Sequence, residues 1–163
     1  MEDKGVIEDI EGSSRAGPSG AFVFFGATGD LAYKEIFPAL QNMIRGGRLN
    51  VPIVGVAKSG WGLDELRDRA RKSIKDHDGV VDEAAFSKLC HLLRYVDGDY
   101  GDPGTYVKLG DTLGGAARPA HYLAIPPSLF ETVVKGIERA GCAKDARVIL
   151  ESPLDGTSLQ RAR

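Results

Sequence analysis

Five short apolar runs, spaced along most of the chain, constrain the fold more than any other feature. They lie at residues 22–25, 51–56, 93–96, 122–125 and 148–150. Continuous apolar runs of this length are typical of strands buried on both faces of a parallel sheet. Longer segments with helical periodicity separate them, which predicts right-handed βαβ units. The expected fold class is therefore α/β: a doubly wound, Rossmann-like parallel sheet of about five strands with helices on both faces.

The helices are expected to begin near residues 29, 64, 82, 103 and 128. Pro38 falls inside the first of them, which predicts a kink or a restart near Phe37. Ser128 and Glu131 have the spacing of a capping box, so we expect Ser128 to cap the last helix.

The loop after the first apolar run has the composition of a phosphate-binding turn. Gly26 permits a tight turn, Gly29 permits close approach of the backbone to a pyrophosphate, and Ala32 permits close helix–strand packing. The N–H groups at the start of the following helix would then face the anion. We therefore expect this loop to bind a dinucleotide; its candidate residues are Gly26, Ala27, Thr28, Gly29, Asp30 and Leu31.

The end of the second apolar run indicates which dinucleotide is bound. NAD-binding domains usually carry an acid here, which holds the ribose 2′-hydroxyl. This chain has Lys58 and Ser59 instead, a cation and a hydroxyl that suit the 2′-phosphate of NADP. Thr28 could add a hydroxyl to the same phosphate. The alternative is that Lys58 is an ordinary solvated lysine.

Composition and charge exclude several other functions. The formal net charge is −2, which gives no reason to expect nucleic acid or an acidic membrane as a partner. A charged stretch of alternating sign, residues 64–72, indicates a solvated helix face. No apolar stretch approaches the ~20 residues of a membrane span. The cysteines and histidines lack metal-ligand spacing, so no metal site is expected.

Four segments of the chain together resemble the coenzyme domain of the glucose-6-phosphate dehydrogenase family. They are residues 26–32 (GATGDLA), 36–40 (IFPAL), 55–59 (GVAKS) and 122–130 (YLAIPPSLF). The resemblance implies NADP binding and oxidation of glucose 6-phosphate to 6-phosphogluconolactone in the pentose phosphate pathway. It implies a 2′-phosphate contact at Lys58, where the family usually has arginine. It also implies contacts at Asp99 and Tyr100, on the adenine side, and at Tyr122, near the cofactor.

The chain departs from the family pattern at its end. The family continues its fifth strand with a lysine that serves substrate and cofactor, and Ser152 stands at that position. The family's sugar-phosphate motif and its His–Asp base pair lie in a second domain that this sequence does not include, so no catalytic residue is assigned. We expect the 163 residues alone to have no dehydrogenase activity. The alternative is a stand-alone NADP-binding module without catalysis, acting as a sensor or a subunit partner.

These expectations divide the chain into three parts. Residues 1–20 are expected to be a mobile leader, 21–151 the NADP-binding domain and 152–163 a truncated tail, which resembles the start of a helix in the family. The acidic leader is not a secretory signal, so the cytoplasm is the expected location. Glucose 6-phosphate as a partner, and a homo-oligomer, are expected only of a full-length form.

Overall fold

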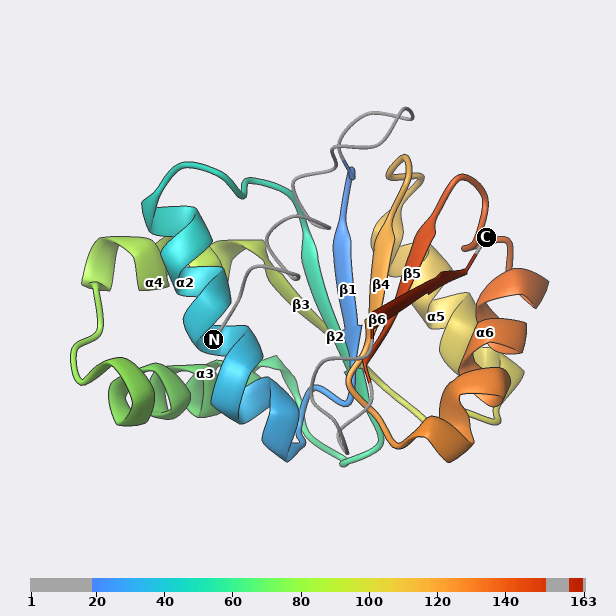
Figure 1. The fold of residues 1–163 in the computed structure, drawn as a ribbon, viewed down its shortest axis with the longest axis horizontal. Coiled ribbons are helices and arrows are strands. Elements are labelled where there is room, and N and C mark those ends of the chain that lie inside the picture. The colour runs from blue at the N-terminus through green and yellow to red at the C-terminus, as the bar shows by residue number, and fades with distance from the viewer. Residues whose placement is uncertain (1–18, 152–158, 163) are drawn as a thin grey trace.

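The computed structural model describes residues 19–151 and 159–162, and it contains a single six-stranded sheet (Figure 1). The order of its strands across the sheet is β3-β2-β1-β4-β5-β6. The first five run parallel and β6 runs antiparallel to β5. The expected doubly wound parallel sheet is therefore confirmed. The strand bounds are β1 Phe22–Phe25, β2 Ile53–Ala57, β3 Leu93–Asp97, β4 Ala120–Leu123, β5 Arg147–Glu151 and β6 Leu159–Ala162.

Helices cover both faces of the sheet (Figure 1). One face carries a π-helical turn, Ala32–Ile36, that runs directly into α2, Phe37–Arg45; α3, Leu63–Asp78, and α4, Glu83–Leu92, pack beside them. The other face carries α5, Pro103–Leu113, and α6, Phe130–Arg139, the latter preceded by a short 3₁₀ turn, Pro127–Leu129. Each face therefore has its own apolar core.

Strand β1 shows why a continuous apolar run is needed at the centre of such a sheet. All four of its residues are buried, and successive side chains point to opposite faces. Phe22 and Phe24 join the core under α2 and α3, where Phe24 meets Phe37 edge to face at 5.6 Å between ring centroids. Val23 and Phe25 join the core under α5 and α6. A polar side chain on either face would be buried without a partner.

Of two expectations about the helices, one is confirmed and the other is wrong. The predicted restart near Phe37 is confirmed, because α2 begins there and Pro38 lies in its first turn, where a missing N–H is tolerated. The predicted cap at Ser128 is wrong. Ser128 lies inside the 3₁₀ turn, α6 begins after Leu129 without a side-chain cap, and Glu131 pairs with Lys135 at 2.8 Å. The rigid Pro126–Pro127 pair starts the turn too early for Ser128 to stand at the helix N-cap.

The two ends of the domain are also informative. Ser19 and Gly20 already contact the domain, Gly20 through a 2.7 Å hydrogen bond to the Ala117 carbonyl; the rest of the expected leader lies outside the described residues. The expectation of a helix in the tail is wrong for residues 159–162, because they form the strand β6. The edge of β5 would otherwise present a row of unpaired backbone groups, and β6 pairs with it.

Candidate dinucleotide-binding site

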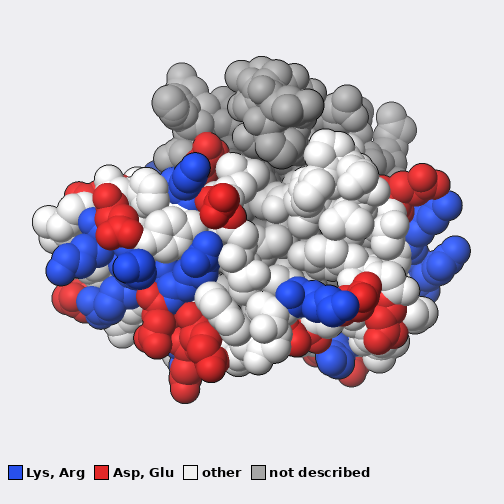
Figure 2. Space-filling view, turned by 90° about the horizontal axis from the view of Figure 1, so that it is seen from below, with Lys and Arg blue, Asp and Glu red and all other residues white. Residues whose placement is uncertain are grey.

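The candidate site lies at the carboxyl edge of the sheet, where the strand order reverses between β1 and β4. From β1 the chain proceeds outward to β2 and β3, then crosses back to β4 and continues the other way. In open α/β sheets this reversal leaves a crevice at the strand ends, where ligands bind. Figure 2 views the molecule from this side: the middle of the surface carries uncharged side chains, and charged residues of both signs flank it.

The glycine loop leaves β1 at this reversal, as expected. Gly26 has φ +85°, and a Cβ there would overlap the carbonyl oxygen of Ala124, which follows β4. Gly29 is less constrained, because its Cβ would come within 3.3 Å of the Gly26 oxygen. Ala27 and Ala32 are fully buried, so the loop and the helical turn pack directly against the sheet. Only glycine fits at residue 26.

The remaining residues of the predicted loop take different positions. Leu31 packs against the core under α2 and α3, which anchors the start of the helix. Asp30 is exposed, and Thr28 is partly exposed. The Gly29 N–H between them donates to the Gly26 carbonyl at 2.9 Å, and the helix begins at Asp30; the N–H groups of its first turn have no acceptors within the helix itself. This is the arrangement that a phosphate group requires.

Tyr100 ties the glycine loop to β2 through its hydroxyl group. The hydroxyl accepts a hydrogen bond from the Gly26 N–H at 2.8 Å and donates one to the Val56 carbonyl at 3.2 Å. Its ring lies against Phe25, with 5.9 Å between centroids. Burial raises the pKa of Tyr100 to about 12, so the phenol remains protonated at neutral pH. The structure therefore brings Tyr100 to the predicted site.

Lys58 and Asp99 meet beside this loop. The Lys58 ammonium group donates to Asp99 Oδ2 at 3.0 Å, and the Gly101 N–H donates to Asp99 Oδ1 at 2.8 Å. These two contacts, first the Gly101 N–H and then Lys58, hold the pKa of Asp99 below its usual value. The side chains of Lys58 and Asp99 are 71% and 54% exposed, so both remain accessible to a ligand.

Asp97 is a residue of this site that the sequence analysis missed. One of its carboxylate oxygens, Oδ1, accepts from the backbone N–H groups of Ser59 and Gly60, at 2.9 and 3.0 Å, and from the Tyr95 hydroxyl at 2.7 Å. Hydrogen bonding, above all from the Ser59 N–H, lowers the pKa of Asp97. The carboxylate thereby fixes the loop that carries Lys58. The sequence feature that could have identified Asp97 is an acid at the end of the third predicted strand. In the sheet, Asp97 lies opposite Ala57, the last residue of β2.

The Ser59 hydroxyl, expected to help hold a 2′-phosphate, is directed into the protein. It lies 2.6 Å from the Tyr95 hydroxyl and accepts from the Trp61 N–H at 3.2 Å. Of the pair that the sequence pattern suggested, Lys58 is exposed and Ser59 is only partly exposed.

Arg69 is a second residue that the sequence analysis missed, because its segment looked like a solvated helix face. Its guanidinium donates to the Gly29 carbonyl at 3.2 Å and lies 4.6 Å from the centroid of the Tyr33 ring. It therefore connects α3 to the glycine loop. Arg67, on the same helix, donates to the Cys90 carbonyl at 3.1 Å. The alternating charges of the segment gave no sign of these two contacts, because only the tertiary structure brings the Gly29 and Cys90 carbonyls near the two arginines.

Tyr122 lies in the core. It is fully buried, and its ring centroid is 6.3 Å from that of Phe22. Its expected role near the cofactor stays a prediction. Ser152, at the position of the family's lysine, lies outside the described residues.

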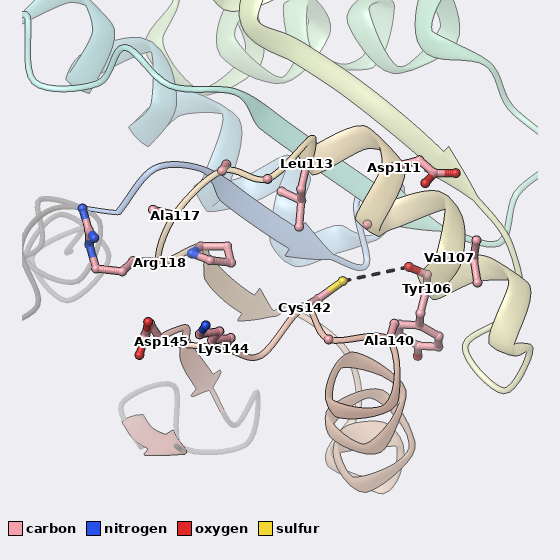
Figure 3. A pocket seen from close by; sticks show the side chains of 15 residues that line it. Tyr106, Val107, Asp111, Leu113, Ala117, Arg118, Ala140, Cys142, Lys144 and Asp145 are labelled. Atoms are coloured by element: carbon pink, nitrogen blue, oxygen red, sulfur yellow. Dashed lines mark hydrogen bonds between the residues drawn. The ribbon is translucent and has the colours of Figure 1, made fainter.

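A cavity lies at the other end of the sheet, between α5 and the loops that precede β4 and β5 (Figure 3). Its volume is about 620 Å³, and its charged lining residues are two cations, Arg118 and Lys144, and two acids, Asp111 and Asp145. None of the predicted site residues lines it. Across residues 19–151, no three His, Cys, Asp or Glu side chains form a group that could hold a metal ion. No helix in the described part of the chain could cross a membrane.

Comparison with known proteins identifies the family. A family model described as the NAD-binding domain of glucose-6-phosphate dehydrogenase matches residues 23–163. The chain belongs to the glucose-6-phosphate dehydrogenase family. This match covers the described domain from the second residue of β1 onward, and the resemblance noted from the sequence motifs is confirmed.

Individual relatives agree with this assignment. Glucose-6-phosphate 1-dehydrogenase 1 of Mycobacterium tuberculosis is 39% identical over 137 residues, which cover 84% of this chain and 29% of that protein. The cytoplasmic glucose-6-phosphate 1-dehydrogenase 6 of Arabidopsis thaliana is 34% identical over 160 residues, which cover 87% of this chain and 31% of that protein. The chain therefore spans less than a third of the length of these relatives.

A solved structure shows the same fold. The crystal structure of glucose-6-phosphate 1-dehydrogenase from Mycobacterium avium superimposes with a TM-score of 0.79 at 43% identity, over 83% of this chain and 30% of that one. A second glucose-6-phosphate dehydrogenase, solved with glucose 6-phosphate, gives a TM-score of 0.70 at 28% identity over 82% of this chain and 30% of its own.

Proposed function

We propose that this chain is the NADP-binding part of an enzyme that oxidises glucose 6-phosphate to 6-phosphogluconolactone. The observation that carries the proposal is the glycine loop at the reversal of the strand order, with Lys58 beside it at the end of β2. The family assignment supports the reaction. The relatives carry it out with chains about three times as long, so the groups that act on the sugar phosphate would belong to the longer protein.

The residues present fit a dinucleotide. Gly26 keeps the loop free of a side chain where it meets the Ala124 carbonyl. The Gly29 N–H already donates to the Gly26 carbonyl, so the backbone N–H groups of Thr28, Asp30 and Leu31 would hold the pyrophosphate. Lys58 would hold the 2′-phosphate, with its loop fixed by Asp97. Bound NADP⁺ supplies the hydride acceptor. The chain's own contribution is to bind and orient that coenzyme.

Replacement of Lys58 tests the preference for NADP. In a calorimetric titration of the purified chain, we expect Lys58→Ala to weaken NADP⁺ binding roughly tenfold or more and to change NAD⁺ binding little, because only NADP carries the 2′-phosphate. Lys144→Ala is the matched control, since Lys144 lines the cavity at the other end of the sheet.

Two outcomes of this titration would contradict the proposal. Equal losses for NADP⁺ and NAD⁺ in the Lys58→Ala variant would show that Lys58 is not a 2′-phosphate ligand. Binding of neither dinucleotide by the unmodified chain would refute the coenzyme-binding function itself.

We further infer a cytoplasmic location, supported by the name of the Arabidopsis relative and by two cysteines that are both free. Glucose 6-phosphate and a second copy of the chain would be partners of the longer form.

A further inference from the structure

The cation proposed to hold the 2′-phosphate already has an anionic partner. Lys58 is paired with Asp99 at 3.0 Å, and within the described residues it forms no other salt bridge. The Gly101 N–H holds the other oxygen of Asp99 at 2.8 Å, which anchors the carboxylate beside Lys58. A phosphate that binds Lys58 must therefore displace this pair or lie next to the carboxylate.

The same carboxylate has the chemistry that NAD requires. In NAD-binding domains an acid at the end of the second strand accepts a hydrogen bond from the ribose 2′-hydroxyl. Here β2 ends without an acid, but Asp99 reaches the side chain of Lys58, which directly follows β2, from beyond the end of β3. Its side chain is 54% exposed, so an oxygen can be offered to a ligand. The edge of the sheet after β2 and β3 therefore carries a cation suited to the 2′-phosphate of NADP, Lys58, and an acid suited to the 2′-hydroxyl of NAD, Asp99.

We propose that Asp99 is a specificity-determining residue, which weakens the binding of NADP and supports the binding of NAD at this site. The inference rests on the proposed coenzyme-binding function. A 2′-phosphate carries close to two negative charges at neutral pH, and Asp99 both repels it and competes for Lys58. The 2′-hydroxyl of NAD is neutral and donates to the carboxylate instead.

The substitution Asp99→Asn isolates this charge. Asparagine keeps the oxygen that accepts from the Gly101 N–H, so the loop should retain its conformation, while Lys58 loses its anionic partner. The matched control is Asp111→Asn, an exposed acid on α5 that lines the cavity at the opposite end of the sheet. Circular dichroism melts of the three proteins establish that each is folded.

The experiment is a calorimetric titration of the unmodified chain, Asp99→Asn and Asp111→Asn with NADP⁺ and with NAD⁺. We expect Asp99→Asn to tighten NADP⁺ binding by about 3- to 10-fold and to leave NAD⁺ binding unchanged or weaker, so that the preference ratio rises. The change should shrink at high salt, because both groups are exposed.

The outcomes separate this inference from the proposed function. A preference ratio in Asp99→Asn that matches those of the unmodified chain and Asp111→Asn would overturn the role of Asp99 and leave the coenzyme site intact. A fall in the ratio would also overturn it. If the unmodified chain bound neither dinucleotide, the proposed function and this inference would fail together.

Discussion

At the scale of single residues, Gly26 is the position with the fewest alternatives. Its φ of +85° disfavours any side chain, and a Cβ would in addition overlap the Ala124 carbonyl oxygen. Gly47 offers a comparison, because it has a similar φ of +74° but open space around it. The two glycines therefore separate backbone strain from steric overlap.

We expect Gly26→Ala to lower the free energy of unfolding by on the order of 3 kcal/mol, because strain and overlap add. Gly47→Ala should cost about 1 kcal/mol, from strain alone. Urea unfolding followed by circular dichroism measures both. Similar costs for the two variants would show that the contact with Ala124 does not constrain residue 26.

At the scale of elements, the end of β3 organises the loop between β2 and α3. Asp97 accepts hydrogen bonds from two successive backbone N–H groups of that loop and from Tyr95. The loop has glycine at residues 60 and 62, so without these hydrogen bonds its backbone could adopt many conformations. Lys58 thus depends for its position on a neighbouring strand.

Replacement of Asp97 tests this dependence. We expect Asp97→Ala to lower the free energy of unfolding by about 1–2 kcal/mol, because it leaves the Ser59 and Gly60 N–H groups without their acceptor in a partly exposed place; the Tyr95 hydroxyl keeps the Ala57 carbonyl at 3.2 Å. It should also weaken NADP⁺ binding. Asp97→Asn keeps an acceptor oxygen and should lose less than half as much. If urea unfolding gave the same value for both variants as for the unmodified chain, Asp97 would have no role in holding the loop.

At the scale of the whole molecule, a buried histidine of the core links stability to pH in the acidic range. His121 on β4 is fully buried, its Nε2 lies 3.0 Å from the Cys142 carbonyl, and Nδ1 has no partner among the described residues. Burial lowers the pKa of His121 to about 4. The folded protein therefore holds this imidazole neutral at pH values where the unfolded chain would protonate it.

The sign of the effect follows from the two pKa values. Because the folded pKa lies below the unfolded value of about 6.5, the contribution to stability is full above pH ~6.5 and is lost as the pH falls towards 4. The loss should reach up to about 3 kcal/mol. We expect His121→Gln to remove this part of the pH dependence, measured by urea unfolding from pH 7 to 4.5. The exposed His91, replaced by Gln, is the control; equal slopes in the two variants would contradict the prediction.

The sequence by itself determined the architecture and the place of the loop. Buried parallel strands must be apolar on both faces, and this requirement leaves a pattern that can be read in the sequence. Of the five runs, the one that forms β3 meets it least, because β3 lies at the edge of the sheet and Arg94 is exposed. A tight turn between strand and helix requires glycine at Gly26, so the phosphate-binding turn could also be located. These are local requirements, met by residues close together in the chain.

Only the tertiary structure decided which side chains meet at the site. Tyr100 reaches Gly26 across 74 positions, Lys58 meets Asp99 across 41, and Arg69 reaches Gly29 across 40. A charged residue has the same local signature whether it is solvated or bonded to a distant group. Its partner is set by strand order and helix packing, which is why the acid beside Lys58 could not be found from the end of the second strand alone.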